Sequence, residues 1–149
     1  QKTLNLPNTP FAMKAGLVNA NNRWCTVDWR TCESTAAKNI HVLGDATLSA
    51  PLMPKSGQMA NQQAKMCAAA VIALLNGQPP NPAPLISNTC YSFVSEKEAI
   101  HVASVHTWNA TQNTLTTVAG SGGVSAQRSE QEGNFGHAWA RAVWSDMLG

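Results

Sequence analysis

The sequence predicts an α/β part over residues 1–78 followed by an α+β part over residues 79–149. Three observations favour this order: a continuous apolar run leading to a long helical segment, a cluster of four prolines, and short segments rich in Val, Ile and Thr before a final helix. Hydrophobic residues make up 44% of the chain and charged residues 12%, as in folded globular proteins. The net charge of +2 is too small for nucleic-acid binding, and no apolar stretch approaches the length of a membrane-spanning helix.

The first elements of the chain are weakly marked. Residues 1–11 carry prolines and asparagines and are expected to be irregular. Residues 12–20 predict at most a short helix. Residues 24–29 predict a short strand, because polar and apolar side chains alternate there.

Residues 39–46 carry a stronger signal, a nearly continuous apolar run that ends in Gly44 and Asp45. Such runs are typical of a strand buried on both faces of a parallel sheet. Ligands of open α/β sheets bind beyond the carboxyl ends of the strands, so the Asp45 carboxylate is a candidate acceptor for cofactor hydroxyl groups. A plain turn after the strand explains the same two residues.

A long helix is predicted over residues 55–76. Ser56 is a good N-cap, and Gly77 followed by prolines is a good stop. The amino end of a helix carries unpaired N–H groups and a partial positive charge, which attract an anion or an electron-rich carbonyl. The candidate binding residues at this end are Met53, Pro54, Lys55 and Ser56. Ordinary helix capping explains the same segment.

The prolines of residues 77–84 predict a linker, and beyond it the sequence changes to short segments rich in Val, Ile and Thr. Three segments predict short strands: residues 90–95, 99–108 and 114–119. A hairpin turn is expected between the last two, a flexible connection over residues 120–123, and an amphipathic helix over residues 134–148.

The four cysteines and four histidines predict no metal or haem site in this chain. No two cysteines have C-x-x-C spacing, and the C-x-x-C-H motif for haem attachment is absent. Cys67 lies in an apolar helical stretch and is expected to be a small buried hydrophobe. His101 and His106 would face opposite sides of a strand. Trp139 and Trp144 are expected in the core of the final helix.

Six short motifs occur in a fixed order along most of the chain: IHVLGDA at 40–46, MPKSG at 53–57, AN at 60–61 with QAK at 63–65, AAAV at 68–71, LLNG at 74–77 and NTCYS at 88–92. Together they resemble the flavoprotein subunit of flavocytochrome c sulfide dehydrogenase, least clearly over residues 95–133. The resemblance implies the C-terminal remnant of a Rossmann-like FAD domain. A small antiparallel-sheet and helix domain of the FAD/NAD-linked reductase type would follow it.

The resemblance also implies the cofactor and its site. In that family the Gly-Asp pair binds the ribityl–pyrophosphate region of FAD, and the Met-Pro-Lys-Ser segment approaches the isoalloxazine ring. The implied FAD-binding residues are Gly44, Asp45, Met53, Pro54, Lys55, Ser56 and Trp139. Cys90 is implied as one half of a redox-active disulfide beside the flavin, and we expect its partner outside this chain.

The implied activity is that of an oxidoreductase in the periplasm. Sulfide would be oxidised through the disulfide and FAD, and a cytochrome c subunit that carries haem c would receive the electrons. A preceding half of the same flavoprotein would supply the G-x-G-x-x-G motif and the partner of Cys90. Two alternatives are a pyridine-nucleotide-disulfide flavoprotein that uses NAD(P)H, and a non-catalytic module that docks a cytochrome.

Overall fold

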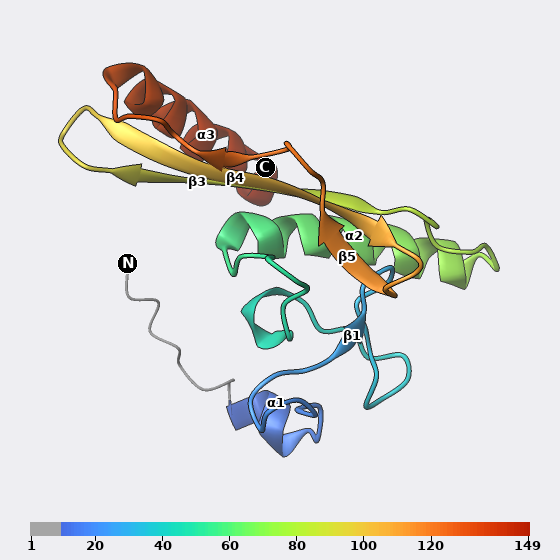
Figure 1. Ribbon diagram of the computed structural model, residues 1–149. Coiled ribbons are helices and arrows are strands. Elements are labelled where there is room, and N and C mark those ends of the chain that lie inside the picture. The colour runs from blue at the N-terminus through green and yellow to red at the C-terminus, as the bar shows by residue number, and fades with distance from the viewer. Residues whose placement is uncertain (1–9) are drawn as a thin grey trace.

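The structure, a computed structural model, describes residues 10–149. Its centre is an antiparallel sheet between two long helices: α2 (Gly57–Leu75) lies on one side and α3 (Glu130–Leu148) on the other (Figure 1). Residues 10–56 form a smaller, mostly irregular part beside α2. The expectation for residues 1–9 lies outside the described residues.

The first part contains only short elements. These are α1 (Pro10–Lys14), β1 (Val27–Asp28), β2 (Glu33–Ser34) and a 3-10 turn, η1 (Gly44–Ala46). β1 and β2 pair antiparallel. The predicted strand at 24–29 is therefore confirmed over two residues, and the predicted short helix begins and ends earlier than residues 12–20.

The strand predicted at residues 39–46 is wrong. His41 makes only one antiparallel bridge, to Glu33, and Ile40 is 44% exposed, so this run is not buried on both faces. A parallel strand needs parallel neighbours, and the described chain pairs no two named strands in parallel. The positive φ of Gly44, 70°, turns the chain into η1 instead. The Rossmann-like remnant is thus not confirmed in residues 10–149.

The long helix predicted at 55–76 is confirmed as α2. The Ser56 side chain accepts a hydrogen bond from the Met59 N–H at 3.0 Å, which caps the first turn. Gly77, with a φ of 68°, follows the last turn. The buried side chains recur every three or four residues: Met59, Gln63, Cys67 and Ala70. None of the described helices is long and apolar enough to cross a membrane.

The sheet has the order β3-β4-β5, with β6 also paired to β4. Its strands are β3 (Leu85–Phe93), β4 (Ala99–Asn109), β5 (Thr114–Thr117) and β6 (Gly123–Val124). The register sets Cys90 opposite Val102, and all pairs are antiparallel. The three predicted strands and the hairpin are confirmed, and β3 starts five residues earlier than expected, at Leu85.

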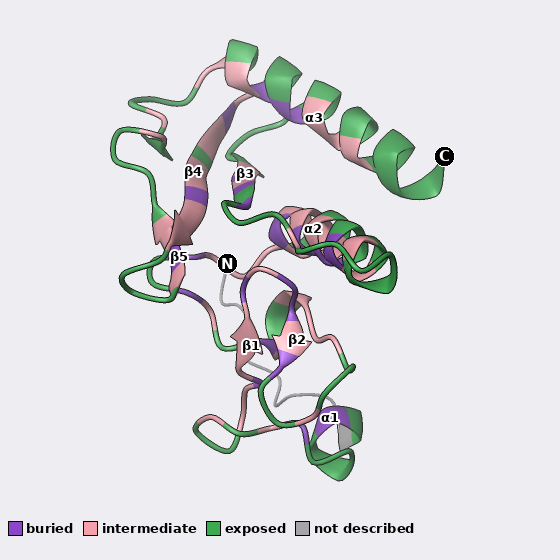
Figure 2. Ribbon diagram, turned by 90° about the vertical axis from the view of Figure 1, so that its right-hand side faces the viewer, coloured by how far each residue is buried: buried purple, intermediate pink, exposed green. Residues whose placement is uncertain are grey.

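One apolar core joins both sides of the proline-rich segment. It consists of Trp29, Ala50, Met53, Met59, Ile86 and Leu115. Figure 2 marks buried residues on α2, β3 and β5, the elements that carry the last three. The division at residue 78 stays a prediction, and the packing of α2 against β3 means that the two parts share this core.

A polar cluster fixes α3 to β4. His101 Nδ1 lies 2.8 Å from Glu132 Oε2, and Ser125 Oγ lies 3.0 Å from Glu132 Oε1. The hydrogen bond from His101 lowers the pKa of the Glu132 carboxyl, and the bond from Ser125 adds to this.

This lowered pKa predicts an acid-sensitive contribution to stability. A carboxylate with a depressed folded-state pKa stabilises the fold above its unfolded pKa of about 4.3, and the contribution is lost as the pH falls through the folded value. Glu132→Gln should therefore flatten the fall in stability between roughly pH 5 and pH 3. Urea midpoints measured across this range test it, with Glu96→Gln in the exposed β3–β4 turn as the control. Parallel curves for wild type and Glu132→Gln would contradict it.

Candidate functional site

The amino end of α2 lies among the residues that the sequence singles out. Lys55 donates from Nζ to the backbone carbonyl of Asp45 at 3.0 Å and to that of Thr47 at 2.6 Å. The same ammonium lies 4.0 Å from the centroid of the Trp24 ring. Burial lowers the pKa of Lys55. Lys55 therefore ties η1 to the start of α2.

Gly44 lets η1 approach α2 closely. A Cβ at this position would lie 3.3 Å from the Cβ of Ala60. The Gly44 N–H donates to Gln63 Oε1 at 2.6 Å, and Gln63 Nε2 lies 3.5 Å from the sulfur of Met53. Gln63 thus fixes the Gly-Asp turn, and Met53 belongs to the core rather than to an open surface.

The outer side of this helix end presents polar groups. Asp45, Pro54 and Ser56 line a hollow of only about 10 Å³, and the side chain of Asp45 is exposed. Within the described part of the chain, the N–H groups of Gly57 and Gln58 donate no hydrogen bond. The first turn of α2 thus leaves two N–H donors without an acceptor, and the exposed Asp45 carboxylate lines the same small hollow as Pro54 and Ser56.

Cys90 is joined to the same helix end through Asn88. The Ser56 hydroxyl donates to Asn88 Oδ1 at 2.5 Å, and the Cys90 thiol donates to the same oxygen at 3.6 Å. Asn88 is 2% exposed, whereas Cys90 is half-buried and carries a free thiol. Sequence reasoning missed Asn88, although a residue two positions before Cys90 in a strand must share its face.

Gln58 connects Trp139 to the amino end of α2. Its Oε1 accepts from the backbone N–H of Thr89 at 3.1 Å and from the indole N–H of Trp139 at 2.7 Å. The Trp139 ring also packs against Tyr91, with 5.7 Å between centroids. One amide oxygen therefore links α2, the edge strand β3 and α3. Sequence reasoning missed it, although an edge strand needs an acceptor for its outward N–H groups.

Loss of this shared acceptor should cost stability. Gln58→Leu leaves the Thr89 and Trp139 N–H groups without their acceptor, and we expect a loss of about 1–3 kcal/mol in the free energy of unfolding. Gln58→Glu keeps an acceptor oxygen and should retain most of it. The measurement is urea unfolding followed by tryptophan fluorescence. The control is Gln62→Leu, one helical turn further along α2. A loss of equal size in this control would contradict the role of Gln58 as the shared acceptor.

The two tryptophans of α3 differ in burial. Trp139 is half-buried, in contact with Gln58 and Tyr91. Trp144, expected in the core, is 62% exposed, so that expectation is wrong. The reason is that α3 extends past the sheet towards its carboxyl end, where Figure 2 colours most of the helix as exposed.

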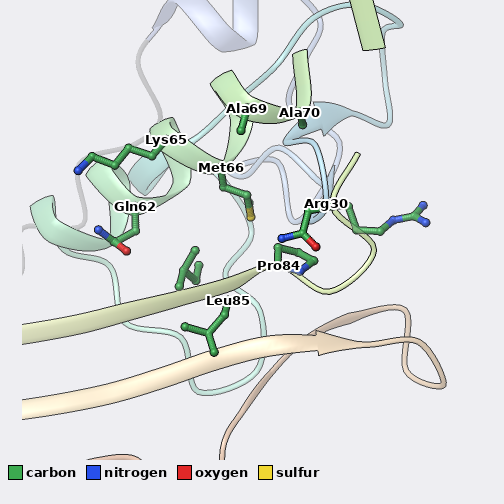
Figure 3. A pocket seen from close by; sticks show the side chains of 10 residues that line it. Arg30, Gln62, Lys65, Met66, Ala69, Ala70, Pro84 and Leu85 are labelled. Carbon is green, nitrogen blue, oxygen red and sulfur yellow. The ribbon is translucent and has the colours of Figure 1, made fainter. Parts of the chain in front are cut away.

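A second hollow of about 460 Å³ lies away from these residues, between α2, the start of β3 and Arg30 (Figure 3). Its two cations are already paired: Arg30 lies 2.8 Å from Asp28, and Lys65 lies 2.5 Å from Asp146. None of the residues predicted to bind a cofactor lines it. This hollow is therefore not the candidate site.

No three His, Cys, Asp or Glu side chains of residues 10–149 form a group that could hold a metal ion. His41 Nδ1 lies 2.8 Å from the carbonyl of Thr31, and His106 is buried with Nε2 3.1 Å from the Ser104 hydroxyl. The candidate site described above is made of polar, thiol and aromatic side chains. It joins Lys55, Ser56, Gln58, Asn88, Cys90 and Trp139.

Residues 82–148 match the protein-family model described as "Flavocytochrome c sulphide dehydrogenase, flavin-binding". The match includes Cys90 and Trp139 and begins after α2, so the Gly-Asp turn and the helix amino end lie outside it. The mixed helix and antiparallel sheet of the structure is compatible with an α+β flavin-binding domain.

Proposed function

Because residues 82–148 match the model of the flavin-binding family of flavocytochrome c sulphide dehydrogenase, we propose that this chain serves the oxidation of sulfide through Cys90 and FAD. The family is that of an FAD-dependent oxidoreductase subunit. The observation that carries the proposal is the hydrogen-bonded link from Ser56 through Asn88 to Cys90. It joins a predicted FAD-binding residue outside the matched range to the proposed redox cysteine inside it.

The residues at the amino end of α2 fit one edge of a flavin. The free N–H groups of Gly57 and Gln58 suit the electron-rich carbonyl edge of the ring, and the exposed Asp45 carboxylate suits ribityl hydroxyls. The hollow beside them is too small for a ring, so they would contact its edge from outside. When bound, FAD supplies an acceptor for two electrons and a donor of single electrons.

Cys90 would act through thiol–disulfide exchange. In its oxidised form Cys90 is bonded to a second cysteine on another part of the flavoprotein. Hydrosulfide attacks one sulfur of this bond, the S–S bond breaks, a persulfide forms, and the other sulfur leaves as a thiolate. Asn88 Oδ1 accepts the thiol hydrogen of reduced Cys90 and so sets the direction of its S–H bond.

The proposed electron acceptor is a cytochrome c subunit carrying haem c, and the proposed compartment is the periplasm. The family name supports the first, because a flavocytochrome contains both groups. The second follows from the family resemblance described above.

The test is to mix the purified flavoprotein that contains this chain with sulfide or with NADH under anaerobic conditions. Sulfide should bleach the flavin absorbance, NADH should not, and added cytochrome c should then be reduced. Bleaching by NADH alone would favour a pyridine-nucleotide-dependent flavoprotein. A preparation without flavin that still binds cytochrome c would favour a docking module.

Asp45 should contribute to flavin retention. Asp45→Ala removes a carboxylate acceptor, and we expect a loss of about 1–3 kcal/mol of holoprotein stability, with less flavin retained after purification. Asp45→Asn keeps one acceptor oxygen and should lose less. The measurements are the flavin-to-protein absorbance ratio and the melting temperature of the holoprotein. Unchanged values in Asp45→Ala would remove Asp45 from the site.

A further inference from the structure

Two buried cysteines without a role in the proposed chemistry lie where the loop after β1 packs against α2. Cys32 follows β1 and is 0% exposed, and Cys67 lies on the buried side of α2 and is 7% exposed. The sulfur of Cys32 lies 3.9 Å from the carbonyl oxygen of Gln63, one helical turn before Cys67. Burial, and after it the neighbouring Cys67 side chain, raise the pKa of Cys32, which agrees with this proximity.

Both cysteines are held on fixed backbone. The Cys32 N–H donates to the Asp28 carbonyl at 2.7 Å, and its carbonyl accepts from the Val42 N–H at 2.9 Å. Its φ of 59° is uncommon outside glycine and is maintained by these two bonds. Cys67 is in the middle of α2. A disulfide needs two cysteines whose Cα atoms lie within about 7 Å, and ordered backbone on both sides would hold such a pair in place.

We propose that Cys32 and Cys67 form a structural disulfide that joins the loop after β1 to α2. The reaction breaks two S–H bonds and forms one S–S bond. Two protons and two electrons pass to a disulfide oxidant such as oxidised glutathione, which leaves as two thiols. Cys67, the more exposed of the pair, would form the mixed disulfide first, and Cys32 would then displace the carrier.

The bond would serve the fold, not the redox chemistry of Cys90. Burial raises the pKa of both thiols, that of Cys32 to about 12, which keeps them protonated and slow to exchange once the protein has folded. Oxidation would therefore take place while the chain folds. Cys25 is also buried, packed with Ala12 and Leu17, and would stay reduced.

Peptide mapping tests the pairing in the flavoprotein that contains this chain. The protein is refolded with a glutathione redox couple, denatured without reductant and alkylated with N-ethylmaleimide. One disulfide-linked peptide pair should contain Cys32 and Cys67, and Cys25 should be alkylated. Alkylation of all four cysteines, or a bond from Cys32 to Cys25 or Cys90, would overturn the proposal.

Melting temperature separates a covalent bond from packing of two thiols. Wild type refolded with reductant should melt on the order of 10 °C below wild type refolded without it. A Cys32→Ala/Cys67→Ala double variant should show a much smaller difference between the two conditions, because only the proposed disulfide of Cys90 is left for the reductant to break. Cys25→Ala should keep the full wild-type response. An equal melting temperature for wild type under both conditions would refute the bond.

Discussion

Replacing Cys90 by serine in the whole flavoprotein should lower the rate of flavin reduction by sulfide by about 1,000-fold or more. Serine keeps the size of the side chain and an O–H donor for Asn88, so the fold and the flavin content should not change. It cannot form a disulfide, and hydrosulfide then has no sulfur to attack. Stopped-flow absorbance under anaerobic conditions measures the rate.

The control for this experiment is Cys25→Ala, which removes a thiol that packs with Ala12 and Leu17 outside the candidate site. It should reduce flavin at the wild-type rate. A Cys90→Ser protein that retains flavin and is still reduced rapidly by sulfide would refute the role of Cys90. It would leave this residue as a half-buried thiol of β3.

Gly133→Ala should be among the most destabilising single substitutions in the chain. Gly133 lies in the first turn of α3, and a Cβ there would be 1.9 Å from the carbonyl oxygen of Lys97 in the β3–β4 turn. The obstacle is backbone, so no side chain can rotate away. We expect a loss of about 3 kcal/mol in the free energy of unfolding, the upper range for overpacking.

Gly57→Ala is the matched control, because Gly57 also lies in the first turn of a helix and a Cβ there would meet nothing within 4 Å. It should leave stability unchanged or raise it by up to about 1 kcal/mol. Urea unfolding of the three proteins measures the difference. Equal stability of Gly133→Ala and wild type would mean that α3 does not approach the β3–β4 turn this closely.

Local signals predicted the parts of the fold that local physics decides. Ser56 and Gly77 marked the ends of α2, because capping depends on nearby backbone groups. The start of α3 was missed by four residues, since its first turn contains Gly133, a poor helix former kept there by the close approach to Lys97. The run at 39–46 failed because burial on two faces depends on neighbouring strands, which no single segment contains.

The candidate site shows the same division. The motifs singled out Ser56 and Cys90, the family resemblance added Trp139, and the structure joins all three to the amino end of α2. Gln58 and Asn88, which make those connections, were missed. Each acts through partners on other elements, and a contact between residues 81 positions apart, as between Gln58 and Trp139, depends on how helices and strands pack.

Asn88 offers one amide oxygen to two donors, the Ser56 hydroxyl and the Cys90 thiol. Conversion of Cys90 to a disulfide removes the sulfur-bound hydrogen, and the oxygen is then left to Ser56 alone. The hydroxyl that caps α2 would be held more firmly in the oxidised protein than in the reduced one. The stability of the helix cap would then depend on the redox state of Cys90. Hydrogen exchange at the Met59 amide should be slower in the oxidised protein than in the reduced one.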